Sequence, residues 1–177
     1  MNSFNYLNPA RVVFGNKPYE SIEQFLKDNG VSSLMMVHTN SAVRLGIFDE
    51  VKKVCEKLGV GFVSNGKVES NPKIELIREL VEESRKNSVD CLLAAGGGSV
   101  IDTAKAVAMG VPYDGDFWDF YSGKRVEKAL PIGTVLTIAA AGSEGSPDSV
   151  ITKEEGMLKR GASGNALRPK FSILNPA

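Results

Sequence analysis

The feature that most constrains this chain is a run of three glycines between an apolar segment and an amphipathic one. Residues 91–109 read CLLAAGGGSVIDTAKAVAM. The apolar segment, residues 91–95, is short enough for a buried strand, and the apolar positions after the glycines recur at helical spacing. We therefore predict a strand, a glycine turn and the start of a helix.

This glycine turn suits the binding of a phosphate group. Gly96, Gly97 and Gly98 lack a Cβ atom and can adopt positive φ, so a ligand can approach their amides. The first turn of the following helix leaves N–H groups unpaired at the positive end of the helix dipole. Ser99, with Asp102 three residues later, has the pattern of an N-cap and capping box. The glycines could serve only to turn the chain, but the strand–glycine–helix order favours a phosphate or pyrophosphate site.

Strand-like and helix-like segments alternate along the chain. Strands are predicted before Gly15 and at residues 34–37, 60–63, 91–95, 131–138, 150–152 and 171–174, with helices within residues 18–30, 47–59 and 71–84. This alternation predicts an α/β fold: a Rossmann-like, doubly wound, mostly parallel sheet with helices on both faces. A ligand crevice is then expected at the switch point of strand order, lined by the loops after Val37, Val63 and Ala95.

Composition limits the classes of partner. The 177 residues include 21 basic and 21 acidic side chains, which gives no reason to expect nucleic acid or an anionic membrane as a partner. No apolar run reaches the length of about 20 residues that spans a bilayer, and the first residues lack the pattern of a secretory signal. Cys55 and Cys91 fall in a predicted helix and a predicted strand, which favours buried reduced thiols and a cytoplasmic location.

Other possible sites are weaker. His38 is the only histidine, and no cluster of metal-ligating residues is visible. Residues 61–68 (GFVSNGKV) have part of the spacing of a phosphate-binding loop, but Val68 stands where a magnesium-binding Ser or Thr is required. The aromatic, aspartate-rich residues 113–121 are predicted to form a surface loop anchored by Phe117, Trp118 and Phe120.

The segment that starts at Gly96 resembles the GGGSxxDxAK signature of the iron-dependent (group III) alcohol dehydrogenases. The similarity extends through nearly the whole chain and is greatest to the butanol dehydrogenase-like branch. Members of that family are about twice as long, and their metal ligands, one Asp and three His, lie in a helical second domain. The resemblance implies that residues 1–177 form a single dinucleotide-binding domain, the N-terminal cofactor-binding half, without the helical metal-binding domain.

The resemblance also implies roles for individual residues. It assigns the cofactor pyrophosphate to Gly97, Gly98 and Ser99 with Asp102 close by, the adenosine ribose to Thr39 and Asn40, the adenine side to Asn71, the nicotinamide side to Thr137, and a cofactor ribose to Lys159. An aspartate at the position of Thr39 would favour NAD, because it bonds the ribose 2′-OH and repels a 2′-phosphate. Its absence permits NADP and favours it over NAD. Ile138 and Ala141 replace family threonines, which weakens the expected contacts on the nicotinamide side.

The function that follows is the NAD(P)-binding part of a metal-dependent alcohol dehydrogenase. In the complete family enzyme, iron or zinc acts as a Lewis acid while hydride passes between the alcohol and the nicotinamide. The chain itself is expected to bind the dinucleotide without turning over alcohols. The alternative is a non-catalytic nucleotide-sensing or assembly module, and self-association into a homo-oligomer is left open.

Overall fold

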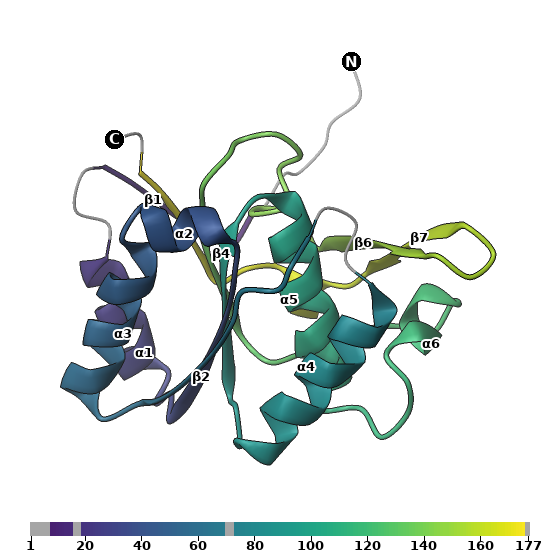
Figure 1. Cartoon of the computed structure of the whole chain (residues 1–177), viewed down its shortest axis with the longest axis horizontal. Coiled ribbons are helices and arrows are strands. Elements are labelled where there is room, and N and C mark those ends of the chain that lie inside the picture. Colours follow the sequence, from purple (N-terminus) through teal and green to yellow (C-terminus); the bar gives the residue numbers. More distant parts are fainter. Residues whose placement is uncertain (1–7, 16–18, 70–72, 176–177) are drawn as a thin grey trace, which may run out of the picture.

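The computed structural model describes residues 8–15, 19–69 and 73–175. Its elements are β1 (Arg11–Phe14), α1 (Glu20–Asp28), β2 (Ser33–His38), α2 (Asn40–Arg44), α3 (Ile47–Leu58), β3 (Gly61–Asn65), α4 (Ile74–Lys86), β4 (Cys91–Gly96), α5 (Gly98–Gly110), α6 (Trp118–Tyr121), β5 (Ile132–Leu136), β6 (Asp148–Lys153), β7 (Leu158–Ser163), a 3₁₀ turn (Asn165–Leu167) and β8 (Phe171–Leu174) (Figure 1).

Six strands form one sheet in the order β1-β8-β5-β4-β2-β3, and every neighbouring pair is parallel. The antiparallel pairing lies outside this sheet, in the β6–β7 hairpin. Helices connect most of the parallel strands, as crossover connections require. The predicted doubly wound parallel sheet is confirmed.

The central strands are buried on both faces, which explains why they read as unbroken apolar runs. Along β4, Leu92 and Ala94 join a core cluster shared with α4 and α5. The alternate residues Cys91 and Leu93 join a second cluster shared with α1 and α3. Helices therefore cover both faces of the sheet, as predicted.

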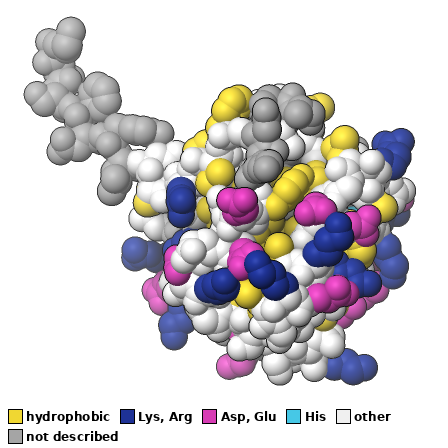
Figure 2. All heavy atoms as spheres, turned by 90° about the vertical axis from the view of Figure 1, so that its left-hand side faces the viewer, with side chains coloured by type: hydrophobic (Ala, Val, Ile, Leu, Met, Phe, Trp, Pro, Cys, Tyr) yellow, Lys and Arg dark blue, Asp and Glu magenta, His cyan; other side chains and the backbone are white. Residues whose placement is uncertain are grey.

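The solvent side of α1 and α3 carries charges of both signs (Figure 2). Glu23 of α1 accepts hydrogen bonds from Lys27 at 2.7 Å and from Lys57 of α3 at 2.8 Å. These two ammonium groups lower the pKa of the Glu23 carboxyl to about 2. Because such exposed pairs contribute little to stability, the two helices are held mainly by their shared apolar core.

Helix α5 is the most deeply placed helix among the described residues. Its side chains are buried nearly all round, from Val100 to Met109. It packs against β4, against α4, and against β6 of the hairpin. This burial fixes both the start of α5, where the glycine run lies, and its end.

Three smaller predictions have clear outcomes. Cys55 and Cys91 are buried and free, as expected, and burial raises the pKa of the Cys55 thiol to about 11. The loop expected after Val37 contains the short helix α2. Residues 113–121 are not wholly a loop, because α6 forms where the Asp116 carboxylate accepts the Trp118 backbone N–H at 2.8 Å.

Candidate functional site

The switch point of strand order lies between β2 and β4. These strands are neighbours, yet the chain leaves β2 for β3 on one side and leaves β4 for β5 on the other. The loops that leave their carboxyl ends therefore diverge, which is where parallel α/β sheets bind ligands. In Figure 1, α2 and the first turn of α5 lie at this edge of the sheet.

The glycine turn opens the N-terminal end of α5 toward this edge. Gly97 is the N-cap residue in an extended conformation, and its carbonyl accepts the N–H groups of Val100 at 3.1 Å and Ile101 at 3.2 Å. Helix geometry leaves the first-turn amides, including those of Gly98 and Ser99, without an intrahelical partner. These donors and the helix dipole suit an anion.

Two local predictions about this turn are wrong. Ser99 is not the N-cap, because the helix already begins at Gly98, and Asp102 does not form a capping box. Although the three glycines can adopt positive φ, none of them does so in this turn. The chain reaches α5 through an extended Gly97, so backbone conformation does not require glycine in this turn.

The space around the three glycines differs in an informative way. A Cβ atom on Gly96 would lie 2.5 Å from Cγ2 of Val100, and one on Gly97 would lie 2.8 Å from Cγ2 of Ile138. A Cβ on Gly98 would meet only Ala141, at an ordinary 3.7 Å. Protein packing thus explains the first two glycines, whereas the protein leaves room for a side chain at Gly98.

A cavity of about 480 Å³ lies beside this turn at the carboxyl edge of the sheet. It is lined by Thr39, Asn40, Ser41, Arg44, Gly66, Lys67, Val68, Glu69, Gly97, Thr137 and Ile138. These residues follow β2, β3, β4 and β5, so the loops expected after the first three of these strands do meet there. Four of the predicted site residues, Thr39, Asn40, Gly97 and Thr137, line this one cavity.

Backbone and side-chain contacts fix two of these four residues. The Thr39 N–H donates to the Ala95 carbonyl at 3.4 Å, and the Thr137 N–H donates to the Gly96 carbonyl at 3.1 Å. The hydroxyls of Thr39 and Ser41 are 2.6 Å apart. The loops after β2 and β5 are thereby tied to the end of β4, on either side of the glycine turn.

The other predicted residues lie differently. Gly98 and Ser99 form the first turn of α5, next to the cavity. The Asp102 carboxylate accepts hydrogen bonds from the Ser143 hydroxyl at 2.5 Å and the Val150 N–H at 3.1 Å, so it faces protein groups. Lys159 is exposed on the β6–β7 hairpin and is not among the cavity residues. Asn71 lies outside the described residues.

Sequence reasoning missed two cations at the cavity, Arg44 and Lys67. Lys67 donates to Glu79 of α4 at 3.1 Å. Arg44 is the last residue of the short helix α2, which follows β2 and brings this side chain to the cavity. Lys67 could have been found from its position just after β3, on the same edge of the sheet as Thr39.

Among residues 8–15, 19–69 and 73–175, no group of three or more His, Cys, Asp or Glu side chains could hold a metal ion. His38 is buried at the end of β2, where its ring lies 5.3 Å from that of Phe48 and its Nδ1 is 3.2 Å from the Thr39 carbonyl. These contacts give the histidine a structural role. The part of the chain described also holds no helix long and apolar enough to cross a membrane.

Comparison with known proteins agrees with this geometry. Residues 9–176 match the family described as iron-containing alcohol dehydrogenase. The chain belongs to this family. It is 42% identical over 177 residues to a probable NADH-dependent butanol dehydrogenase of Bacillus subtilis, covering 99% of this chain and 45% of the relative. It is 33% identical over 181 residues to an NADPH-dependent aldehyde reductase of Escherichia coli, covering 99% of this chain and 46% of the relative.

Solved structures of this family have the same fold. An NADH-dependent butanol dehydrogenase of Thermotoga maritima superposes with a TM-score of 0.93 at 40% identity, covering 99% of this chain and 45% of that structure. A sulfoacetaldehyde reductase of Bifidobacterium kashiwanohense, solved in complex with NAD⁺, gives a TM-score of 0.88 at 26% identity over 99% of this chain and 47% of that one. The chain thus spans somewhat less than half the length of these relatives, as expected for the cofactor-binding half of a family member.

Proposed function

We propose that the chain is a single NAD(P)-binding domain of a metal-dependent alcohol dehydrogenase. The observation that carries this proposal is the glycine turn, which opens the N-terminal end of α5 beside a cavity at the switch point of the sheet. Free amides and a positive helix end suit a pyrophosphate. Relatives named as NADH- and NADPH-dependent enzymes give further support.

The residues divide into three groups around a bound dinucleotide. Gly97, Gly98 and Ser99 hold the pyrophosphate with their backbone amides. Thr39 and Asn40 face the adenosine ribose from the end of β2, with Asn71 on the adenine side. Thr137 contacts the nicotinamide side, and Lys159 a cofactor ribose. Asp102 contributes indirectly, since its carboxylate holds Ser143.

The room for a side chain at Gly98 supports the proposal that the pyrophosphate binds at this residue. Because a Cβ atom there would meet no close protein atom, packing does not require glycine at this position. A phosphate lying on the first turn of the helix does require it, since close approach to the amide leaves no room for a side chain.

The preferred cofactor is NADP(H). The cavity has Thr39 where a carboxylate would repel a 2′-phosphate, and it is lined by the cations Arg44 and Lys67 together with one acidic residue, Glu69. Lys67 is paired with Glu79 at 3.1 Å, so Arg44 is the cation that attracts the additional phosphate of NADP. Relatives of this chain are named as NADH-dependent and as NADPH-dependent enzymes, so the preference for NADP(H) rests on the side chains that line the cavity.

The described residues fit a dinucleotide but do not supply a metal-ligand set. We therefore assign the 177-residue chain binding of the cofactor without alcohol turnover. In a complete family enzyme the metal supplies Lewis-acid chemistry at the alcohol oxygen, and the residues described here supply the position of the dinucleotide.

The test is a titration of the purified chain with NADPH and with NADH, followed by nicotinamide fluorescence, and an assay for alcohol oxidation with added Fe²⁺ or Zn²⁺. We expect saturable binding, tighter for NADPH, and no turnover. Absence of binding to either dinucleotide would refute the domain assignment. Chelator-sensitive alcohol oxidation by this chain would refute the assignment of binding without turnover.

A further inference from the structure

A lysine lies fully buried in the middle of α5. Lys105 has 0% of its surface exposed, although lysines are almost never buried without partners. Its ammonium group donates to the backbone carbonyls of Ser143 at 2.8 Å, Ser146 at 2.9 Å and Asp148 at 2.7 Å. An ammonium has three N–H donors, so three carbonyls of one short segment use all of them.

A second group on α5 holds the same segment. Asp102, three residues before Lys105, accepts the Ser143 hydroxyl at 2.5 Å and the Val150 N–H at 3.1 Å. The Ser149 hydroxyl donates to the Asp102 carbonyl at 3.0 Å. One turn of α5 therefore fixes residues 143–150, which lead from the β5 end into the β6–β7 hairpin.

The other part of this connection covers the glycine turn. It begins at Thr137, which is bonded to Gly96, and Ile138 lies against Gly97 while Ala141 lies beside Gly98. Gly142 has φ +71°, in the left-handed region, where the chain turns toward the residues that Lys105 holds. The connection is thus fixed at both ends, and the part between them forms one wall beside the first turn of α5.

We propose that Lys105 is a positioning residue for dinucleotide binding: its ammonium group holds residues 143–148, so that residues 137–142 stay in place over the glycine turn. This inference rests on the proposed function, because it needs a dinucleotide at that turn. Lys105 itself does not line the cavity, and it acts through the backbone of the connection.

The charge of Lys105 should therefore control cofactor affinity. Burial lowers the pKa of the Lys105 ammonium group to about 8, and the positive charge of Arg168 also lowers it. The carboxylates of Asp102, Asp148 and Glu144 raise this pKa and so oppose part of the effect. A neutral amine offers two N–H donors to three carbonyls. Loss of the proton then loosens residues 143–148, and binding of the dinucleotide weakens as the pH rises through about 8.

The pH dependence of global stability has the opposite sign. Since the pKa in the folded chain is below the unfolded value of 10.5, the unfolded chain binds more protons between pH 8 and 10.5. The contribution of this group to the free energy of unfolding therefore rises with pH in that window. A residue with a merely structural role would not make cofactor affinity fall there.

The experiment measures the Kd for NADPH and for NADH at pH 7 with the wild-type chain, with Lys105→Met, and with Lys128→Met as an exposed control. We expect Lys105→Met to bind about tenfold more weakly, as for the loss of charged hydrogen bonds, and the control to bind normally. Hydrogen exchange of residues 139–148 should be faster in Lys105→Met alone. Equal affinity of wild type and Lys105→Met would overturn the inference.

A pH series on the wild-type chain tests the same point without a variant, in case Lys105→Met does not fold. The Kd should rise between pH 7 and 9.5 and level off at no more than the roughly tenfold loss expected for Lys105→Met, and a constant Kd would overturn the inference. If the wild-type chain binds neither dinucleotide, the proposed function itself fails and the inference with it. If the wild type binds but shows no dependence on Lys105 or on pH, only the inference fails.

Discussion

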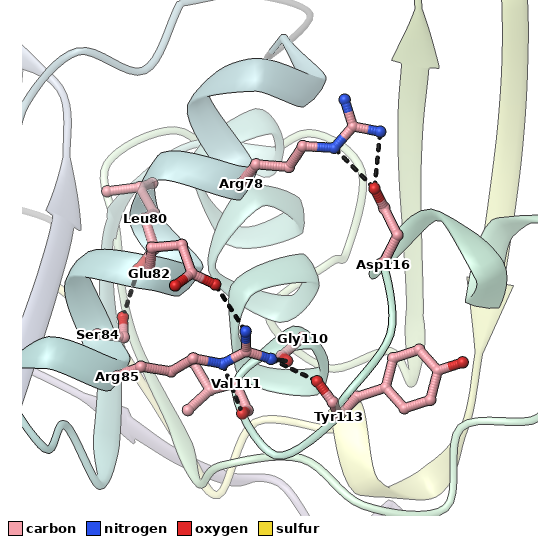
Figure 3. Close-up of polar contacts among 9 residues, drawn as sticks. All are labelled: Arg78, Leu80, Glu82, Ser84, Arg85, Gly110, Val111, Tyr113 and Asp116. Carbon is pink, nitrogen blue, oxygen red and sulfur yellow. Dashed lines mark hydrogen bonds and ion pairs between the residues drawn. The ribbon is translucent and has the colours of Figure 1, made fainter.

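The two ends of α5 are built for different tasks. At the N-terminal end, the glycine turn leaves backbone donors facing a cavity. At the C-terminal end, Arg85 of α4 donates to the carbonyls of Gly110 at 2.9 Å, Val111 at 3.2 Å and Tyr113, while Glu82 accepts from Arg85 at 2.6 Å (Figure 3). The first-turn amides at one end of the helix are open toward the cavity, and the carbonyls at the other end are bonded by Arg85.

This difference predicts which substitutions should affect dinucleotide binding and which should affect the free energy of unfolding. The carbonyls at the end of a helix lack intrahelical partners, and a cation there interacts favourably with the helix dipole. Arg85 supplies that cation from another helix and so also joins α4 to the α5–α6 connection. Substitutions at the open end should alter dinucleotide affinity, and substitutions at the closed end should alter the free energy of unfolding.

The largest effect is expected at the open end from Thr39→Asp. A carboxylate at this position would face the 2′-phosphate of NADPH, and we expect the Kd for NADPH to rise about a hundredfold, equivalent to roughly 2.8 kcal/mol. The Kd for NADH should change little or fall. Thr39→Asn, which has the shape of aspartate without its charge, is the control, and an equal loss of NADPH binding in both variants would argue against a charge effect.

Gly96→Ala tests the comparison of the two ends of α5 in a second way. Gly96 lies at the open end, but this substitution should lower the free energy of unfolding. The added Cβ atom would clash with Val100 in the first turn of α5. Overpacking of this kind costs about 1–3 kcal/mol, which urea denaturation measures. An unchanged free energy of unfolding would mean that α5 can shift freely at its first turn, contrary to its burial.

At the closed end, we expect Arg85→Met to lower the free energy of unfolding by about 1.5 kcal/mol, since it removes charged hydrogen bonds to carbonyls at a half-buried site. The Kd for NADPH should stay within error of the wild type. Weakened cofactor binding, with stability unchanged, would break the proposed division between the two ends of α5.

The smallest effect is expected for Arg78→Met. Arg78 and Asp116 form an ion pair at 2.8 Å beside the Arg85 cluster (Figure 3), but both side chains are more than two-fifths exposed. Exposed pairs contribute about 0–1 kcal/mol, and the change in urea denaturation should fall in that range. If Arg78→Met lowered the free energy of unfolding more than Arg85→Met, then Arg78, and not Arg85, would be the main link between α4 and the α5–α6 connection.

Much of the fold could be predicted from local sequence. The apolar run at residues 91–95 forms β4, as predicted, and the glycines after it form the turn into α5. Because parallel strands end at one edge of a sheet, the meeting of Thr39, Gly97 and Thr137 could also be foreseen. These features depend on residues adjacent in the chain and on simple topology.

The details that could not be predicted depend on contacts between distant segments. Ser99 has the chemistry of an N-cap, but the extended Gly97 lets α5 start two residues before the expected point. A lysine on a helix is normally exposed, but the carbonyls of residues 143–148 meet the ammonium group of Lys105, which is fully buried. The position of Arg44 likewise depends on α2, a helix too short to give a periodic pattern.

The most direct test of the open end of α5 compares Gly98→Ala with Gly161→Ala, a glycine of β7 where an added Cβ would also meet only ordinary contacts. Both variants are measured for thermal unfolding and for NADPH affinity. We predict that Gly98→Ala unfolds at the wild-type temperature or above, because alanine favours the helix, yet binds NADPH at least about tenfold more weakly because its methyl group occupies the space of the pyrophosphate. Wild-type affinity in Gly98→Ala would show that the pyrophosphate does not lie on the first turn of α5.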